Sequence, residues 1–145
     1  MIWVRRVLAV IGGIMVSSLL VFIIELPKHI LYPPPEGVTT TDPSYIASLP
    51  LPAFLILLAG YLIGTFGGGW VAAVIAGEHP ALFASIIAGV MLALTAVMLY
   101  WIEGHPMWFP YVALLGIPIM GVLAGSLVPQ RGKAATKEAK PKQQD

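Results

Sequence analysis

The chain has 145 residues, of which 58% are hydrophobic and only 10% are charged, and its formal net charge is +1. An ordinary soluble domain has about 25% charged residues, so this composition predicts one domain embedded in a lipid bilayer. The absence of cysteine excludes disulfides, Cys-based metal sites and thiol redox chemistry, and the small net charge argues against a nucleic-acid partner.

Four long apolar segments predict membrane-spanning helices at about 7–24, 51–76, 81–102 and 107–128. Each contains about 18 or more nearly uncharged residues, which is enough to cross the hydrocarbon core of a bilayer. Lipid offers the backbone no hydrogen-bond partner, and no segment alternates apolar and polar residues as a barrel strand does. The predicted fold class is therefore all-α, a polytopic four-helix transmembrane domain over 1–128.

The first segment, 7–24, follows Arg5 and Arg6, and a basic start of this kind also precedes the apolar part of a signal peptide. Its apolar run is longer than that of a typical signal peptide, and no pair of small residues suitable for cleavage follows it. We therefore interpret this segment as an uncleaved membrane helix.

The segment 26–50 is the longest connection in the predicted fold. It begins with Tyr-Pro-Pro-Pro at 32–35, which favours a stiff polyproline-type conformation. Asp42 and Pro43 then indicate a turn or helix cap, and 44–48 is long enough for a short surface helix. We expect this loop to cover the ends of the neighbouring helices or to bind a partner subunit.

Small residues recur at four-residue spacing in the predicted spans. In lipid, such rows allow two helix backbones to approach closely, so we expect them to pack helices together, with 51–76 as the central helix. The same rows also suit a homo-oligomer, a larger membrane complex or the lining of a pore. The residues predicted to pack helices are Gly60, Gly64, Gly68, Ser85, Gly89, Gly121 and Gly125.

The basic residues predict the orientation of the chain. Arg5 and Arg6 precede the first span, five further cations lie in 129–145, and the only other cation is Lys28. By the positive-inside rule, both termini are expected in the cytoplasm and the loop 26–50 on the outer side. The tail 129–145 is basic and has nothing to bury, so we expect it to be disordered.

No Asp, Glu, Lys, Arg or His lies in the middle of any predicted span, and this absence argues against a proton-coupled pump. It also separates the chain from the small multidrug-resistance transporters, which have a buried acid in their first helix. The lack of cysteine excludes the four-helix disulfide-forming enzymes, and the histidines lie at helix ends, where they do not suit haem. We therefore expect no cofactor.

Four polar side chains are predicted to meet at the outer side: Glu25, His29, Glu103 and His105. Two imidazoles and two carboxylates suit zinc or another divalent metal, or an acid–base pair. Alternatively they are interfacial caps, with Glu25 paired to Lys28 and the histidines bonded to loop carbonyls. Pro27 lies between Glu25 and His29, so the sequence does not assure the spacing of a regular helical pair.

Three motifs stand beside these spans: Glu-x-x-x-His at 25–29, Tyr-Pro-Pro-Pro at 32–35 and His-Pro-x-Trp-Phe at 105–109. With the glycine-rich second span, they resemble a group of uncharacterised small four-helix proteins of the bacterial inner membrane. The resemblance extends to about residue 128 and implies the same fold and location, but no activity. We expect a non-enzymatic structural or accessory component of a membrane assembly. The alternative is a small transporter, or a metal- or ligand-binding protein that uses the Glu/His cluster.

Overall fold

The computed structural model describes residues 1–130, so the tail predicted at 129–145 lies almost entirely outside the described residues. The described part is helical and contains no strand, which confirms the all-α prediction. Its helices are α1 (Ile2–Leu31), α2 (Pro43–Ser48), α3 (Leu51–Ala76), α4 (Pro80–Trp101) and α5 (Trp108–Ser126). All but α2 are long and apolar enough to cross a membrane, which indicates a multi-pass membrane protein.

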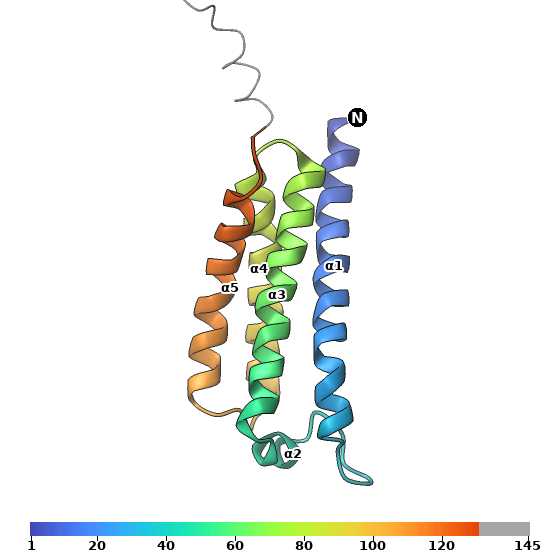
Figure 1. The fold of residues 1–145 in the computed structure, drawn as a ribbon, viewed down its shortest axis with the longest axis vertical. Coiled ribbons are helices and arrows are strands. Elements are labelled where there is room, and N and C mark those ends of the chain that lie inside the picture. The colour runs from blue at the N-terminus through green and yellow to red at the C-terminus, as the bar shows by residue number, and fades with distance from the viewer. Residues whose placement is uncertain (131–145) are drawn as a thin grey trace, which may run out of the picture.

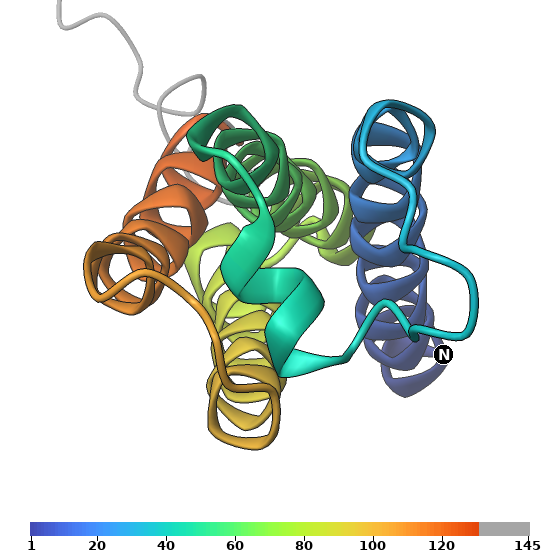
Figure 2. The same ribbon diagram turned by 90° about the horizontal axis from the view of Figure 1, so that it is seen from below.

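The four long helices stand side by side and alternate in direction along the chain (Figure 1). The helix α3 contacts α1, α4 and α5, as predicted for the central helix, whereas α1 contacts α4 only over a short stretch and does not contact α5. The N-terminus and the end of α5 lie at the same end of the bundle, here called the N-terminal end. The short helix α2 lies across the opposite end, here called the α2 end (Figure 2).

The helix α1 is longer than the predicted span of 7–24, because it begins before Arg5 and continues through Pro27 to Leu31. Thirty residues make a helix of roughly 45 Å, which exceeds the roughly 30 Å hydrocarbon core. Charged residues therefore mark where α1 leaves the hydrocarbon and not where the helix ends. A proline removes only one backbone hydrogen bond, and here it lies near the end of the helix.

The other boundaries agree closely with the sequence. The bounds of α3 are those predicted, and α4 and α5 differ from prediction by one or two residues at each end. The predicted loop 26–50 is shorter than expected, because 26–31 belong to α1 and Pro43–Ser48 form α2. The Asp42 side chain caps α2 by accepting a hydrogen bond from the Ser44 backbone N–H at 2.8 Å.

Glycines of α3 and α5 lie where two helices approach most closely. Gly60, Gly64 and Gly68 face α1, and a Cβ atom on Gly64 would lie only 3.0 Å from the Ser17 carbonyl oxygen. Gly121 and Gly125 lie against α4, where a Cβ atom on Gly125 would lie 2.8 Å from the Cα atom of Ala81. These five glycines therefore occupy the packing positions that the sequence assigns to them.

Ser85 and Gly89 do not pack helices within the described bundle, which corrects their predicted role. Both are exposed, and no atom lies within 4 Å of the position that a Cβ atom on Gly89 would take. The helix α4 instead turns Ala84 and Ala88 inward, each one position earlier in the chain. Both rows consist of small residues, so four-residue spacing alone does not indicate which row faces the bundle.

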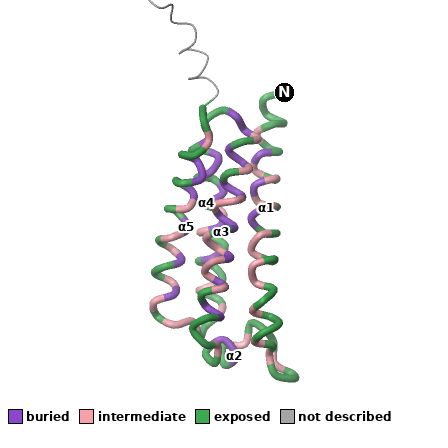
Figure 3. Tube along the Cα trace, viewed as in Figure 1, coloured by how far each residue is buried: buried purple, intermediate pink, exposed green. Residues whose placement is uncertain are grey.

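Burial is unequal among the long helices (Figure 3). The buried share of the spanning segment is greatest in α3 and smallest in α1. In α1 only Ala9, Gly13 and Ser17 are buried, and these residues follow one face. The helix α1 therefore lies at the edge of the bundle and is held mainly by α3.

Candidate functional site

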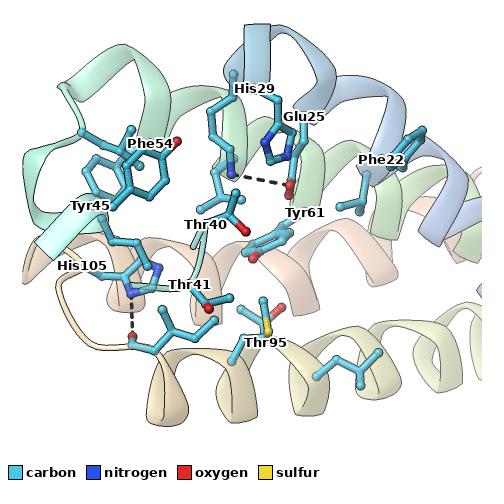
Figure 4. Close-up of a pocket in the computed structure, with 18 of the residues that line it drawn as sticks. Phe22, Glu25, His29, Thr40, Thr41, Tyr45, Phe54, Tyr61, Thr95 and His105 are labelled. Atoms are coloured by element: carbon cyan, nitrogen blue, oxygen red, sulfur yellow. Dashed lines mark hydrogen bonds and ion pairs between the residues drawn. The ribbon is translucent and has the colours of Figure 1, made fainter. Parts of the chain in front are cut away.

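A cavity of about 450 Å³ lies at the α2 end, between α1 and α4. Residues from α3 line its inner side, and Thr40, Thr41 and α2 line the end of the bundle (Figure 4). The cavity exists because α1 and α4 both pack on α3 but approach each other closely only further along the bundle. There, a Cβ atom on Gly13 would lie 2.7 Å from the Ile87 side chain.

An ion pair lies at the α1 side of the cavity. The Lys28 ammonium is 3.7 Å from a carboxylate oxygen of Glu25, and the two side chains are only 12% and 17% exposed. Both residues reach this position because α1 continues beyond the predicted span. His29 also lines the cavity and lies one helical turn after Glu25, so the continuous helix keeps the regular spacing that Pro27 placed in question.

His105 lines the cavity from the turn between α4 and α5. Its Nδ1 atom is 3.0 Å from the Ile102 carbonyl oxygen, and its ring stacks on Phe109 with 5.3 Å between ring centroids. Because a carbonyl oxygen only accepts hydrogen bonds, Nδ1 is the protonated nitrogen of the neutral ring. Partial burial, together with the nearby charge of Lys28, lowers the pKa of His105 and favours this neutral form.

Six residues with hydroxyl groups line the cavity, and two of them lie on the spanning helices α3 and α4: Tyr61 on α3 and Thr95 on α4. Thr95 is 3% exposed, and within residues 1–130 neither side-chain hydroxyl has a hydrogen-bond partner. Thr65, which is equally buried, differs because its hydroxyl donates to the Tyr61 carbonyl oxygen at 2.7 Å. The cavity thus contains hydrogen-bonding capacity that the described chain does not use.

The cavity opens sideways between α1 and α4. Phe22 of α1 and Leu94 and Met98 of α4 line it, and their side chains are 63%, 55% and 47% exposed. These positions belong to two helices that are apolar enough to span a membrane, so in a bilayer the opening faces lipid. The exposed part of the cavity lining between α1 and α4 is therefore apolar.

The helix α2 is fixed in its position over the cavity. The Tyr45 hydroxyl donates to the Tyr32 carbonyl oxygen at 2.6 Å, which ties α2 to the end of α1. Gly104 in the α4–α5 turn has a φ angle of +102°, and a Cβ atom there would lie 2.6 Å from the Pro43 carbonyl oxygen. This turn therefore packs directly against α2, and only glycine fits here without a clash. The contact holds α2 against the ends of α4 and α5.

The predicted Glu/His cluster is assembled only in part. Glu25, His29 and His105 line the cavity, whereas Glu103 is exposed and does not line it. Within residues 1–130, no three His, Cys, Asp or Glu side chains are placed so that they could hold a metal ion together. The sequence places the four residues at the correct end of the bundle, but the positive φ angle of Gly104 redirects the chain between Glu103 and His105.

Tyr61 and Thr95 are two polar cavity residues that sequence reasoning missed. The search for chemistry inside the spans considered ionisable groups, and neither residue is charged at neutral pH. The signal that could have found them is a hydroxyl group in the middle of a long apolar segment, since lipid supplies no partner for it. Such a signal selects several residues, and only the packing of α3 against α4 brings these two to one cavity.

Comparisons with protein-family models, with curated proteins and with solved structures find no match to this chain.

Proposed function

We propose that this protein is a non-enzymatic membrane component that binds an amphipathic ligand in the cavity at the α2 end. The observation that supports this function is the composition of the cavity, with polar residues toward the helix ends and apolar residues along the α1–α4 opening. Its volume of about 450 Å³ lies within the range of small-molecule sites, which is about 300–1,000 Å³. The sideways opening suits a ligand whose apolar part remains in the membrane.

The arrangement of the polar groups supports binding over catalysis. Glu25 is paired with Lys28, and the Nδ1 atom of His105 is bonded to a backbone carbonyl oxygen, so neither group stands ready beside a nucleophile. The absence of three convergent ligands within residues 1–130 also makes an amphiphile a better occupant than a metal ion.

The proposed location is a bacterial inner membrane with both termini in the cytoplasm. Arg5 and Arg6 lie at the N-terminal end of the bundle, and the positive-inside rule places this end in the cytoplasm. The cavity then opens in the half of the bilayer that faces away from the cytoplasm, and its ligand is a component of that leaflet.

The proposal is tested by identifying molecules that remain bound after purification in a mild detergent. We expect native mass spectrometry of the parent protein to show a bound amphiphile in a fixed ratio. Thr95→Phe places a large ring at the cavity wall and should remove this species. The matched control is Ala96→Phe, because Ala96 is the next residue of α4 and is exposed.

Two results would contradict the proposed function. One is a parent protein that retains no amphiphile in any mild detergent. The other is equal retention by Thr95→Phe and Ala96→Phe, which would show that the bound molecule lies elsewhere on the apolar surface. Circular dichroism of both variants checks that the helices are intact.

A further inference from the structure

We propose that the head group held in the cavity is uncharged and accepts hydrogen bonds through a carbonyl oxygen from Tyr61 and Thr95. This inference rests on the proposed function and specifies the chemistry of its ligand. A neutral lipid with a carbonyl-bearing head and an apolar tail has this chemistry. Prenylated quinones and glycerol esters of fatty acids are two sources of it.

The charges that line the cavity favour an uncharged head group. Glu25 and Lys28 are 3.7 Å apart and largely buried, so each already has a partner of opposite charge. The N–H of His105 is used by the Ile102 carbonyl oxygen, and His29 lies at the exposed end of the cavity. A head group with a net charge would have to compete with this ion pair for its partner.

The unused hydroxyls favour a head group that accepts hydrogen bonds. Thr95 is only 3% exposed and lines the cavity. Its hydroxyl has no hydrogen-bond partner in residues 1–130, unlike that of Thr65. Tyr61 lines the same cavity from α3, and Figure 4 shows the two side chains on its wall. Each hydroxyl has a hydrogen to donate, and a carbonyl oxygen can accept from two donors at once. A ligand carbonyl would therefore satisfy both.

The walls of the cavity favour a flat or slender molecule with one apolar tail. Phe54 and Tyr61 supply aromatic surface on the α3 side. Phe22, Leu94 and Met98 line the way out between α1 and α4, where a tail would leave toward lipid. The helix α2, held by Tyr45, covers the end of the bundle, so the tail has this sideways route.

The experiment compares four amphiphiles that differ in their head groups. Decylubiquinone and monoolein are neutral and carry carbonyl oxygens, whereas dodecyl phosphate is anionic and dodecyltrimethylammonium is cationic. Each is titrated against the purified full-length protein in a mild detergent, and binding is followed by native mass spectrometry. We expect at least one neutral probe to bind more tightly than both charged probes, and the tighter of the two identifies the source of the carbonyl.

Three variants test where the carbonyl group lies. Thr95→Val and Tyr61→Phe each remove one hydroxyl with little change in shape, and each should weaken binding of the neutral probe about 3- to 10-fold. Thr65→Val is the matched control, because Thr65 is buried on α3 and its hydroxyl already has a partner. Its affinity for the neutral probe should equal that of the parent.

The outcomes separate this inference from the proposed function. Tighter binding of a charged probe overturns the uncharged head group while the ligand-binding function stands. Neutral binding that neither Thr95→Val nor Tyr61→Phe weakens overturns the assigned position. If none of the four probes binds and the parent carries no amphiphile after purification, the proposed function itself fails.

Discussion

The helix α1 meets its two neighbours in different ways. Against α3 it packs closely along most of its length, and glycines at three positions of α3 permit this contact. Against α4 it packs only over a short stretch, and the cavity lies where the two helices diverge toward the α2 end. We call these two contacts the α1–α3 interface and the α1–α4 seam.

The difference shows how one helix can be both anchored and left open to a ligand. At the α1–α3 interface, the absence of side chains on Gly64 and Gly68 lets the backbones approach, and dispersion contacts stabilise the pair. At the α1–α4 seam, large residues such as Met91, Leu94 and Met98 of α4 line the space between the helices. Close packing at the α1–α3 interface thus holds α1 in place although a cavity separates it from α4.

The strongest test of this comparison is to add a side chain to the α1–α3 interface. A Cβ atom on Gly68 would collide with the Ser17 side chain and approach the Gly13 carbonyl oxygen, so Gly68→Leu must push α1 away from α3. We expect the free energy of unfolding to fall by about 3 kcal/mol, at the upper end of overpacking effects. Thermal unfolding in detergent measures this loss.

Gly89→Leu is the control for this substitution. It introduces the same side chain into another long helix, at a site where no atom lies within 4 Å of the added Cβ position. We expect its free energy of unfolding to lie within about 0.5 kcal/mol of the parent value. Equal stability of Gly68→Leu and Gly89→Leu would contradict the tight α1–α3 interface.

A second test compares the ion pair at the cavity with one at the N-terminal end. Lys28→Met leaves the largely buried Glu25 carboxylate without its partner, and we expect a loss of about 1–3 kcal/mol in the free energy of unfolding. Arg6 and Glu78 are 3.5 Å apart, but their side chains are 39% and 55% exposed. Arg6→Met should therefore cost at most about 1 kcal/mol.

The reason for the Lys28 effect is tested by a second substitution. Glu25→Gln in the Lys28→Met background removes the uncompensated charge and should recover most of the lost stability. Denaturation of the single and double variants in the same detergent gives the comparison. A double variant that is no more stable than Lys28→Met would show that Lys28 acts by packing and not by pairing.

The sequence predicts the number, class and approximate bounds of the spanning helices, because bilayer thickness imposes a length and an apolar composition on each. It is less informative about which face of each helix is buried. Ala84 and Ala88 have the same spacing as Ser85 and Gly89, and only the summed contacts of α4 with α3 and α5 decide which row is buried.

The candidate site is predictable in part for a similar reason. Glu25 and His105 are identified because polar residues at the ends of apolar segments are few. Thr95 is not identified, since a threonine is ordinary in a membrane helix until a cavity is known beside it. The cavity itself depends on the angle between α1 and α4, which results from many small contacts and has no local motif in the sequence.

The smallest expected effect is a pH dependence that we expect at the cavity in the α1–α4 seam and not at the α1–α3 interface. Burial and the charge of Lys28 lower the pKa of His105 below its ordinary value of 6.5. The unfolded chain therefore binds a proton at a higher pH than the folded chain does. The contribution of His105 to stability is present above pH 6.5 and is lost as the pH falls below it toward the pKa of the folded state.

Hydrogen exchange of α2 and the α4–α5 turn, measured between about pH 7.5 and about pH 5 and corrected for intrinsic rates, follows this loss. In the parent, protection of these segments should decrease at the lower pH. The part of α3 around Gly68, which lies against Gly13 and Ser17 of α1, should stay protected. In His105→Gln the decrease should be smaller. The control is His79→Gln, at the exposed turn of the N-terminal end, which should respond to pH as the parent does. If His105→Gln also responded as the parent does, the pH sensitivity would lie outside the cavity.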